Sequence, residues 1–328
     1  MENRLEFLLK QMEKEAENKH DELLDFSTLR LREDGRAVVQ GDVYDLTDWA
    51  SSQLCNLVGV PYRYYQDCPA SLRQHNVNHW MDRMDEENQR LFRLRKEGDE
   101  TVIRSILSEK YTKYDNHEVL HLVNEYLNRA SNDYDIEGWH HDGDNFHLRV
   151  VFNDLSTSIG KTPDGKDDEH KVGIHVMNSE VGKSSIRIIP LVYRLICSNG
   201  LMGMAPNQDK TIFAKRHAYI DHDSMEEQVA AAMRDAIEIG DHTIDVLEKS
   251  KQIMVDDPYE VIDRLAKKEK YSKKMTEAVK DAYRHENDGS LFYVVQSLTD
   301  VAKNYEHDRR LEIETTASKL LQKMTKTA

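Results

Sequence analysis

Three consecutive residues, Gly182-Lys183-Ser184, match the last three letters of the phosphate-binding loop of nucleoside triphosphatases. Such a loop needs another glycine five positions before Gly182, and the sequence has Met177 there. It also needs a following helix whose N-terminus faces the phosphate. Residues 185–196 are instead rich in isoleucine and interrupted by Pro190, which predicts a strand. The sequence therefore argues against an ATP site and predicts a β-hairpin turn at Gly182.

A second group of reactive side chains lies within residues 140–147, where His140, His141 and His147 alternate with two aspartates. Imidazoles and carboxylates at a hairpin tip are the side chains that bind divalent metals. The spacing matches neither HExxH nor a two-histidine-one-carboxylate pattern. A solvated turn therefore remains the alternative to a metal site with these three histidines as candidate ligands.

A third group interleaves basic and aromatic residues along predicted strands. Sequence-neutral binding of single-stranded nucleic acid needs a cationic groove for phosphates and aromatic rings for the bases. For stacking the candidates are Tyr111 and Tyr114. The candidate phosphate contacts are Arg95, Arg104, Lys110, Lys183, Arg187, Arg194, Lys215 and Arg216. The alternatives are an ordinary half-exposed sheet and, for Arg194 and Asp115, a buried ion pair.

Other catalytic constellations are missing from the sequence. There is no GxSxG nucleophile elbow and no GxGxxG dinucleotide loop. The cysteines, Cys55, Cys68 and Cys197, are odd in number and lack CxxC spacing, which argues against disulfides and a cysteine zinc site. We therefore expect no cofactor, a reducing cytoplasmic compartment and a function that is more consistent with binding than with catalysis.

The net charge of −15 disfavours a general nucleic-acid coat, but the charge is unevenly distributed. Residues 171–220 contain seven Lys or Arg and two acids, whereas residues 221–260 contain twelve acids and three bases. A basic segment in an acidic chain can form a phosphate-binding face. The alternative is that the two segments neutralise each other within one fold. No apolar run is long enough for a membrane span, so we expect no membrane partner.

The apolar periodicity predicts an α+β fold, in which central antiparallel β-hairpins form a sheet flanked by helices, with a long helical C-terminal part. An amphipathic helix is predicted over residues 2–25, and a left-handed stop at Asn199-Gly200. Two units follow from the pattern: an α+β core over residues 1–222 and a helical region over residues 223–328.

Several turns and helix ends are predicted from individual residues. Asp34-Gly35 predicts a hairpin turn, and Gly98 predicts another between two strands. Thr47 is a predicted cap for a helix that ends at Gly59. Another charge-rich helix is predicted over residues 76–88.

Two segments, residues 102–116 and 193–201, resemble the R-A-x-L-S-x-x-Y-x-x-x-D and R-x-x-C-x-N-G signatures of the phage/plasmid-like proteins. This family is called domain of unknown function nine-three-two. The resemblance extends over about residues 40–318. The residues that carry the motifs are Ser108, Asp115, Cys197, Asn199 and Gly200.

The resemblance implies a phage, prophage or plasmid context and leaves the activity open. The best-fitting hypothesis is a non-enzymatic, homo-oligomeric protein that binds or anneals single-stranded DNA in the host cytoplasm. An acidic factor that engages a host or phage protein complex, in an anti-defence or assembly role, is the alternative. A metal-dependent enzyme that acts on nucleotides through the histidine cluster is the third hypothesis.

Overall fold

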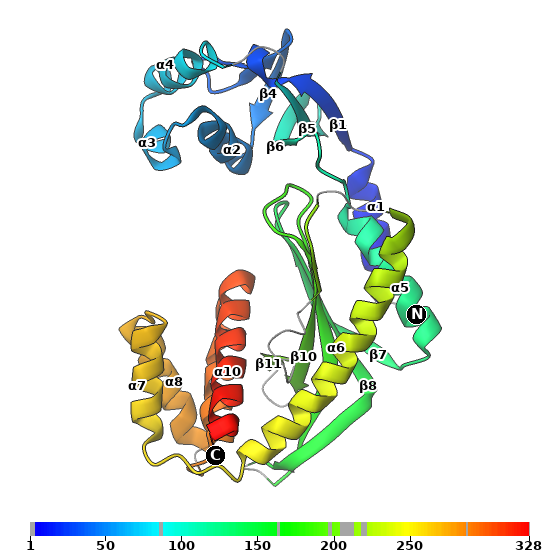
Figure 1. Ribbon diagram of the computed structural model, residues 1–328, viewed down its shortest axis with the longest axis vertical. Coiled ribbons are helices and arrows are strands. Elements are labelled where there is room, and N and C mark those ends of the chain that lie inside the picture. The colour runs from blue at the N-terminus through cyan, green and yellow to red at the C-terminus, as the bar shows by residue number, and fades with distance from the viewer. Residues whose placement is uncertain are drawn as a thin grey trace.

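The chain folds into two lobes, each with its own β-sheet and its own hydrophobic core (Figure 1). This mixture of antiparallel strands and helices, with a helical C-terminal part, confirms the predicted α+β class. The computed structural model describes residues 4–84, 88–162, 165–195, 199–203, 213–217, 222–286 and 288–327.

The first lobe contains a sheet with the strand order β1-β5-β6-β4-β3-β2, in which β4 and β6 pair in parallel. Helices α2, α3 and α4 pack against this sheet and supply Leu54, Tyr65 and Val77 to its core. The elements are β1 (Lys19–Asp25), η1 (Phe26–Thr28), β2 (Arg30–Leu31), β3 (Ala37–Val39), β4 (Asp42–Leu46), α2 (Asp48–Val58), α3 (Tyr62–Asp67), α4 (Ala70–Met81), β5 (Gln89–Glu97) and β6 (Glu100–Ser108).

The second lobe contains an antiparallel sheet with the order β11-β10-β9-β8-β7, and β12 pairs with β10. Its strands are β7 (Tyr134–His141), β8 (Phe146–Lys161), β9 (Asp167–Asn178), β10 (Ile186–Arg194), β11 (Asn199–Met202) and β12 (Phe213–Lys215). Its helices are α1 (Arg4–Ala16), α5 (Asn116–Ala130), α6 (His222–Ser250), α7 (Pro258–Lys268), α8 (Lys273–Glu286), α9 (Leu291–Ala302) and α10 (His307–Thr327).

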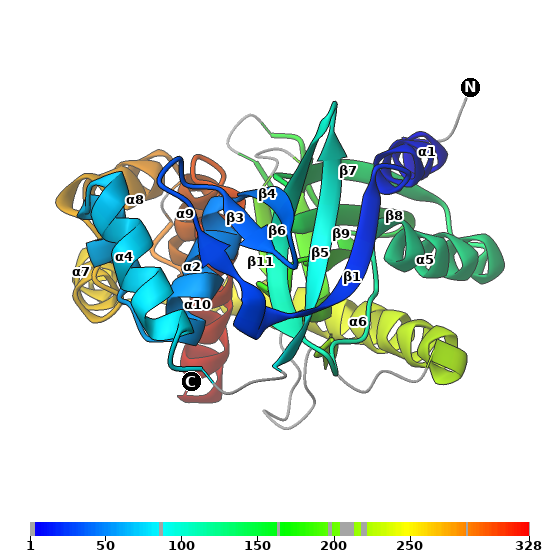
Figure 2. The same ribbon diagram turned by 90° about the horizontal axis from the view of Figure 1, so that it is seen from above.

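Helices cover both faces of the second sheet, as the view from above also shows (Figure 2). One face carries Leu148, Ile174 and Ile188 into a core that includes side chains of α1, α5 and α6. The opposite face packs Ile189 against Leu311 of α10. The main core also includes residues on both sides of the boundary predicted at residue 222.

Local sequence signals explain several element ends. The Thr47 side chain accepts a hydrogen bond from the Ala50 N–H and so begins α2, while Gly59 ends this helix with φ of 75°. Asp115 and Glu118 form a capping box at the start of α5. The predicted turns at Gly35 and Gly98 are confirmed, since each joins two paired strands with positive φ.

Three sequence predictions differ from the structure. The helix predicted over residues 2–25 ends at Ala16, because residues 19–25 pair with β5 as strand β1. The helix predicted over residues 76–88 is found earlier, at Ala70–Met81. Asn199-Gly200 belongs to strand β11 and not to a left-handed stop, because its backbone pairs with the end of β10. Each prediction used only the pattern of neighbouring residues. Strand pairing and packing involve residues that are distant in the chain, so this pattern does not contain them.

No helix in the described part of the chain is both long and apolar enough to cross a membrane.

Candidate nucleic-acid interface at the junction of the two lobes

The turn between β9 and β10 lies at the junction of the lobes. Gly182 has φ of 73° in this turn, and a strand follows it, so the predicted hairpin is confirmed and a triphosphate-binding loop is not formed. The Ser179 hydroxyl donates to the Asp144 carbonyl at 2.6 Å and accepts from the Lys183 N–H at 3.0 Å. These bonds join the tips of two hairpins into one rigid unit.

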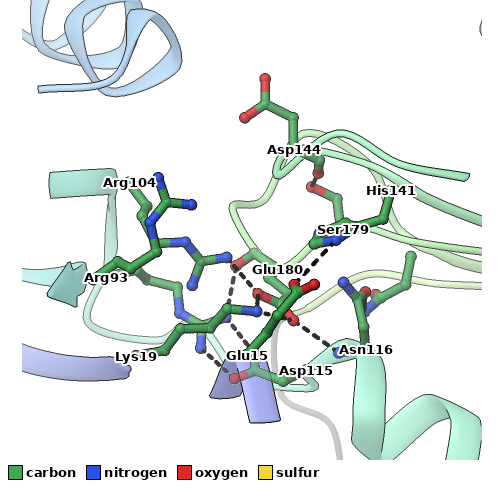
Figure 3. A network of polar contacts seen from close by, with 12 residues as sticks. Glu15, Lys19, Arg93, Arg104, Asp115, Asn116, His141, Asp144, Ser179 and Glu180 are labelled. Atoms are coloured by element: carbon green, nitrogen blue, oxygen red, sulfur yellow. Dashed lines mark hydrogen bonds and ion pairs between the residues drawn. The ribbon is translucent and has the colours of Figure 1, made fainter. Parts of the chain in front are cut away.

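The carboxylate of Glu180 connects this turn to the first lobe (Figure 3). Its oxygens accept hydrogen bonds from Lys19 Nζ at 2.8 Å, from the Asn116 N–H at 3.0 Å and from the Arg104 guanidinium. The Glu180 side chain is 2% exposed. Burial alone would raise the pKa of Glu180, but Arg104 and Lys19 outweigh it and hold this pKa well below its usual range.

Arg93, on the neighbouring strand β5, completes the junction. Its guanidinium donates to Asp21 at 3.0 Å, to Asp115 at 2.9 Å and to the Glu180 carbonyl at 2.7 Å. Burial opposes its charge, but the two carboxylates raise the pKa of Arg93 above its usual value. The guanidinium therefore stays charged, and its hydrogen bonds connect the β9–β10 turn and the start of α5 to strand β5 of the first sheet.

Neither Arg93 nor Glu180 is among the site residues predicted from the sequence, although one signal pointed to the acid. Glu180 is one of only two acids within the basic residues 171–220. An isolated carboxylate among many cations is a candidate for a buried ion pair. Its charged partners, Lys19 and Arg104, each lie more than seventy positions away, so local spacing does not indicate them.

Several residues predicted to contact DNA are buried. Arg104 is 3% exposed and Arg194 is 2% exposed, and Arg194 donates to Asp168 at 2.7 Å. Arg194 and Asp115 each form an ion pair, but not with each other. Arg194 pairs with Asp168, and Asp115 pairs with Arg93.

The motif residues have different surroundings. Asn199 is buried and donates to Thr299 at 2.7 Å, and a side chain at Gly200 would lie 2.7 Å from Leu191. Ser108 is exposed and accepts from the Lys110 N–H. Cys197 lies outside the described residues.

Neither predicted stacking tyrosine presents an open ring. Tyr114 is 5% exposed. The Tyr111 ring stacks on the His217 ring with centroids 5.0 Å apart, and its hydroxyl donates to the Ser179 carbonyl at 3.2 Å. Trp49, which the sequence analysis did not select, lies nearer the surface, with Lys183 Nζ 5.6 Å from its ring centre.

Three segments that are distant in sequence meet beside the turn, namely residues 108–113, 182–187 and 213–217. The rings of Tyr111 and His217 join the first to the third, and β12 pairs with the start of β10 to join the second to the third. Together the segments contain six Lys or Arg and one acid. We call the following residues the basic junction surface: Lys110, Lys183, Arg187, Lys215 and Arg216.

Each member of the basic junction surface is exposed or half-buried. Lys183 pairs with Asp144 at 3.1 Å, and Lys215 donates to Gln228 at 3.3 Å. Arg95 is on β5, where it pairs with the exposed Glu97. The three segments therefore carry five of the eight predicted phosphate contacts, whereas Arg95, Arg104 and Arg194 are held in ion pairs with Glu97, Glu180 and Asp168.

The family profile described as Domain of unknown function (DUF932) matches residues 104–326, which is more than half of the chain. The chain belongs to this family. A search of curated proteins and a search of solved structures each found no match. The DUF932 region begins at Arg104 on β6 and includes the second lobe from α5 onward, whereas β1 to β5 precede it.

The candidate metal ligands of this DUF932 protein do not meet at one point. His141 faces Glu15 at 3.3 Å, whereas His140 and His147 lie near His307 on the other sheet face. Within the described ranges, no three His, Cys, Asp or Glu side chains are placed to hold a metal ion.

Proposed function

We propose that this DUF932 protein binds single-stranded DNA through the basic junction surface, and that it serves as a non-enzymatic annealing factor of a phage or plasmid in the host cytoplasm. The observation that supports the proposal is that three distant segments meet beside the β9–β10 turn and carry Lys110, Lys183, Arg216 and two further cations, each exposed or half-buried. All five of these residues are among the phosphate contacts predicted from the sequence.

Phosphate contacts of this kind give affinity without sequence specificity. Each neutralised phosphate releases counterions, so binding weakens steeply as salt rises. The acidic remainder of the chain repels DNA and confines it to this surface. Trp49, whose ring centre lies 5.6 Å from Lys183 Nζ, is an aromatic group beside this surface.

The test is the binding of a fluorescent oligothymidylate, measured by anisotropy between about 50 and 200 mM salt. The variant K110A/K183A/R216A is expected to bind more weakly and to reduce the slope of log K against log salt by about 2, or about 0.7 for each lost contact. The matched control K267A/K273A/K274A removes three exposed cations around α7 and α8 and should leave the slope unchanged.

Absence of binding by the wild-type chain at about 50 mM salt would exclude the proposal. An equal loss in both triple variants would also count against it, because total charge and not this surface would then govern binding. Annealing is tested separately, by mixing complementary strands with the protein and following duplex formation, and light scattering measures whether the active species is a homo-oligomer.

A further inference from the structure

A pocket of about 320 Å³ lies between the second sheet and the first turn of α10. The described residues that line it include Trp139 on β7, His147 and Arg149 on β8, Tyr193 on β10, and His307 and Arg310 on α10. None of them belongs to the basic junction surface. Its volume is at the lower end of the range of small-ligand sites, about 300–1,000 Å³.

Two guanidinium groups in this pocket share one carboxylate. Arg149 donates to both oxygens of Glu314, at 3.0 and 2.7 Å, and Arg310 Nε donates to the same carboxylate at 2.7 Å. Glu314 is 0% exposed and carries a single negative charge, to which both guanidinium groups donate. The other acids nearby are at the solvent side: Glu137 lines the rim and is exposed, and Asp308 is 65% exposed. The inner wall therefore presents two guanidinium groups that share one buried carboxylate.

Four imidazoles form a row, and two of them, His147 and His307, line the pocket. His140 stacks on His307 with centroids 4.3 Å apart, His307 lies 5.4 Å from His147, and His147 Nδ1 is 3.2 Å from His175 Nε2. Burial, followed by the neighbouring His307, His140 and Arg149, lowers the pKa of His147 to about 4. Burial and nearby basic groups also lower the pKa of His307 and His175, so these three rings are neutral near pH 7.

The first turn of α10 adds to this field. A helix N-terminus carries a partial positive charge and usually has acidic side chains in its first turn. Here His307 and Arg310 accompany Asp308 in that turn, and both line the pocket. Basic side chains at such a position favour an anion, which the dipole, the guanidinium groups and a neutral imidazole N–H would all stabilise.

The outer part of the pocket is aromatic. Trp139 is 40% exposed, and its indole offers a stacking surface for a planar ring. A ligand that satisfies both parts carries an anion at one end and a flat ring at the other. We infer that this pocket binds a phosphomonoester attached to a planar base, the chemistry of a nucleoside monophosphate.

Two sources can supply this chemistry: a free nucleotide or the 5′-phosphorylated end of a DNA strand. The experiment is calorimetric titration of the full-length protein with dTMP, with thymidine and inorganic phosphate as partial ligands. We expect saturable binding of dTMP, weaker binding of phosphate, and none of thymidine. A parallel titration compares an oligonucleotide with and without its 5′-phosphate.

The decisive variant is Arg310→Ala, because Glu314 keeps its bidentate contact with Arg149. We expect affinity for dTMP to fall by at least about tenfold, as for a lost hydrogen bond to a charged group. Arg309→Ala is the matched control, since the neighbouring Arg309 pairs with Glu312 and does not line the pocket. Trp139→Ala should weaken dTMP binding and leave phosphate binding unchanged. Thermal melts confirm that each variant is folded.

Binding of dTMP that depends on Arg310 supports a free nucleotide, and an Arg310-dependent preference for the 5′-phosphorylated strand supports a strand end. If neither ligand binds, or if Arg309→Ala and Arg310→Ala are equally impaired, the inference is wrong. Because K110A/K183A/R216A leaves this pocket intact, it should retain dTMP binding. Failure of the proposed DNA-binding surface is therefore distinguishable from failure of this site.

Discussion

The Glu180 carboxylate and the Arg104 guanidinium form an ion pair in the buried junction between the two lobes. Arg104 is on the first sheet and Glu180 is on the hairpin turn of the second. Lys19 and the Asn116 N–H complete the environment of the carboxylate. The relative position of the lobes, and with it the basic junction surface, depends on this contact.

Replacement of Glu180 by Gln should destabilise the protein by about 3–5 kcal/mol, because Arg104 and Lys19 would remain buried without their counter-charge. Urea denaturation, followed by circular dichroism, measures the free energy of unfolding. Glu97→Gln is the control, since Glu97 is 50% exposed in its pair with Arg95 and should cost at most about 1 kcal/mol. A similar loss of unfolding free energy in both variants would show that the Glu180–Arg104 pair stabilises the protein no more than an exposed ion pair does.

Acidification should destabilise the protein well before its carboxylates titrate. Burial lowers the pKa of His147, His170 and His217 to about 4, from 6.5 in the unfolded chain. Between these pH values the unfolded chain binds more protons, so stability falls as pH falls, by about 1.4 kcal/mol per pH unit for each histidine. Below 4.5, protonation of Glu180 in the unfolded chain adds to the loss.

The pH dependence is measured by urea denaturation between about pH 7 and pH 5. His170→Gln should reduce the slope of stability against pH by the contribution of one histidine, about 1.4 kcal/mol per pH unit. A slope that is the same in wild type and His170→Gln would contradict the assignment.

Gly182→Ala should destabilise the chain more than Gly35→Ala. Both glycines have positive φ, 73° and 88°, so each alanine incurs a backbone cost of about 1–2 kcal/mol. At Gly182 the new Cβ would also lie 2.8 Å from a methyl of Leu107, whereas nothing lies within 4 Å at Gly35. The difference between the two midpoints of urea denaturation measures this contact, and equal midpoints would show that Leu107 moves aside freely.

Trp49 should report DNA binding at the basic junction surface. Its indole donates to the Val181 carbonyl at 2.9 Å and lies beneath Lys183. Displacement of Lys183 towards a phosphate would change the polarity around the ring. We expect oligothymidylate to alter tryptophan emission in the wild type and not in Trp49→Phe. An equal change in the variant would assign the signal to Trp80 or Trp139 and move the binding surface away from the junction.

The sequence alone was sufficient for the features that depend on neighbouring residues. The Thr47 cap, the Gly35 and Gly98 turns and the hairpin at Gly182 were predicted correctly, because backbone conformation there is set within a few positions. The same holds for the family signature around Arg194, since a motif is a local pattern.

Only the tertiary structure decided which cations remain at the surface. Arg187 and Arg194 lie on one strand and look alike in sequence, yet Arg194 meets Asp168 in the core while Arg187 stays half-buried at the edge. Burial of a charge depends on a partner that is distant in the chain, and spacing along the chain does not encode that partner. The Glu180 junction and the pocket beside α10 exist for the same physical reason, because both are made of side chains that only folding brings together.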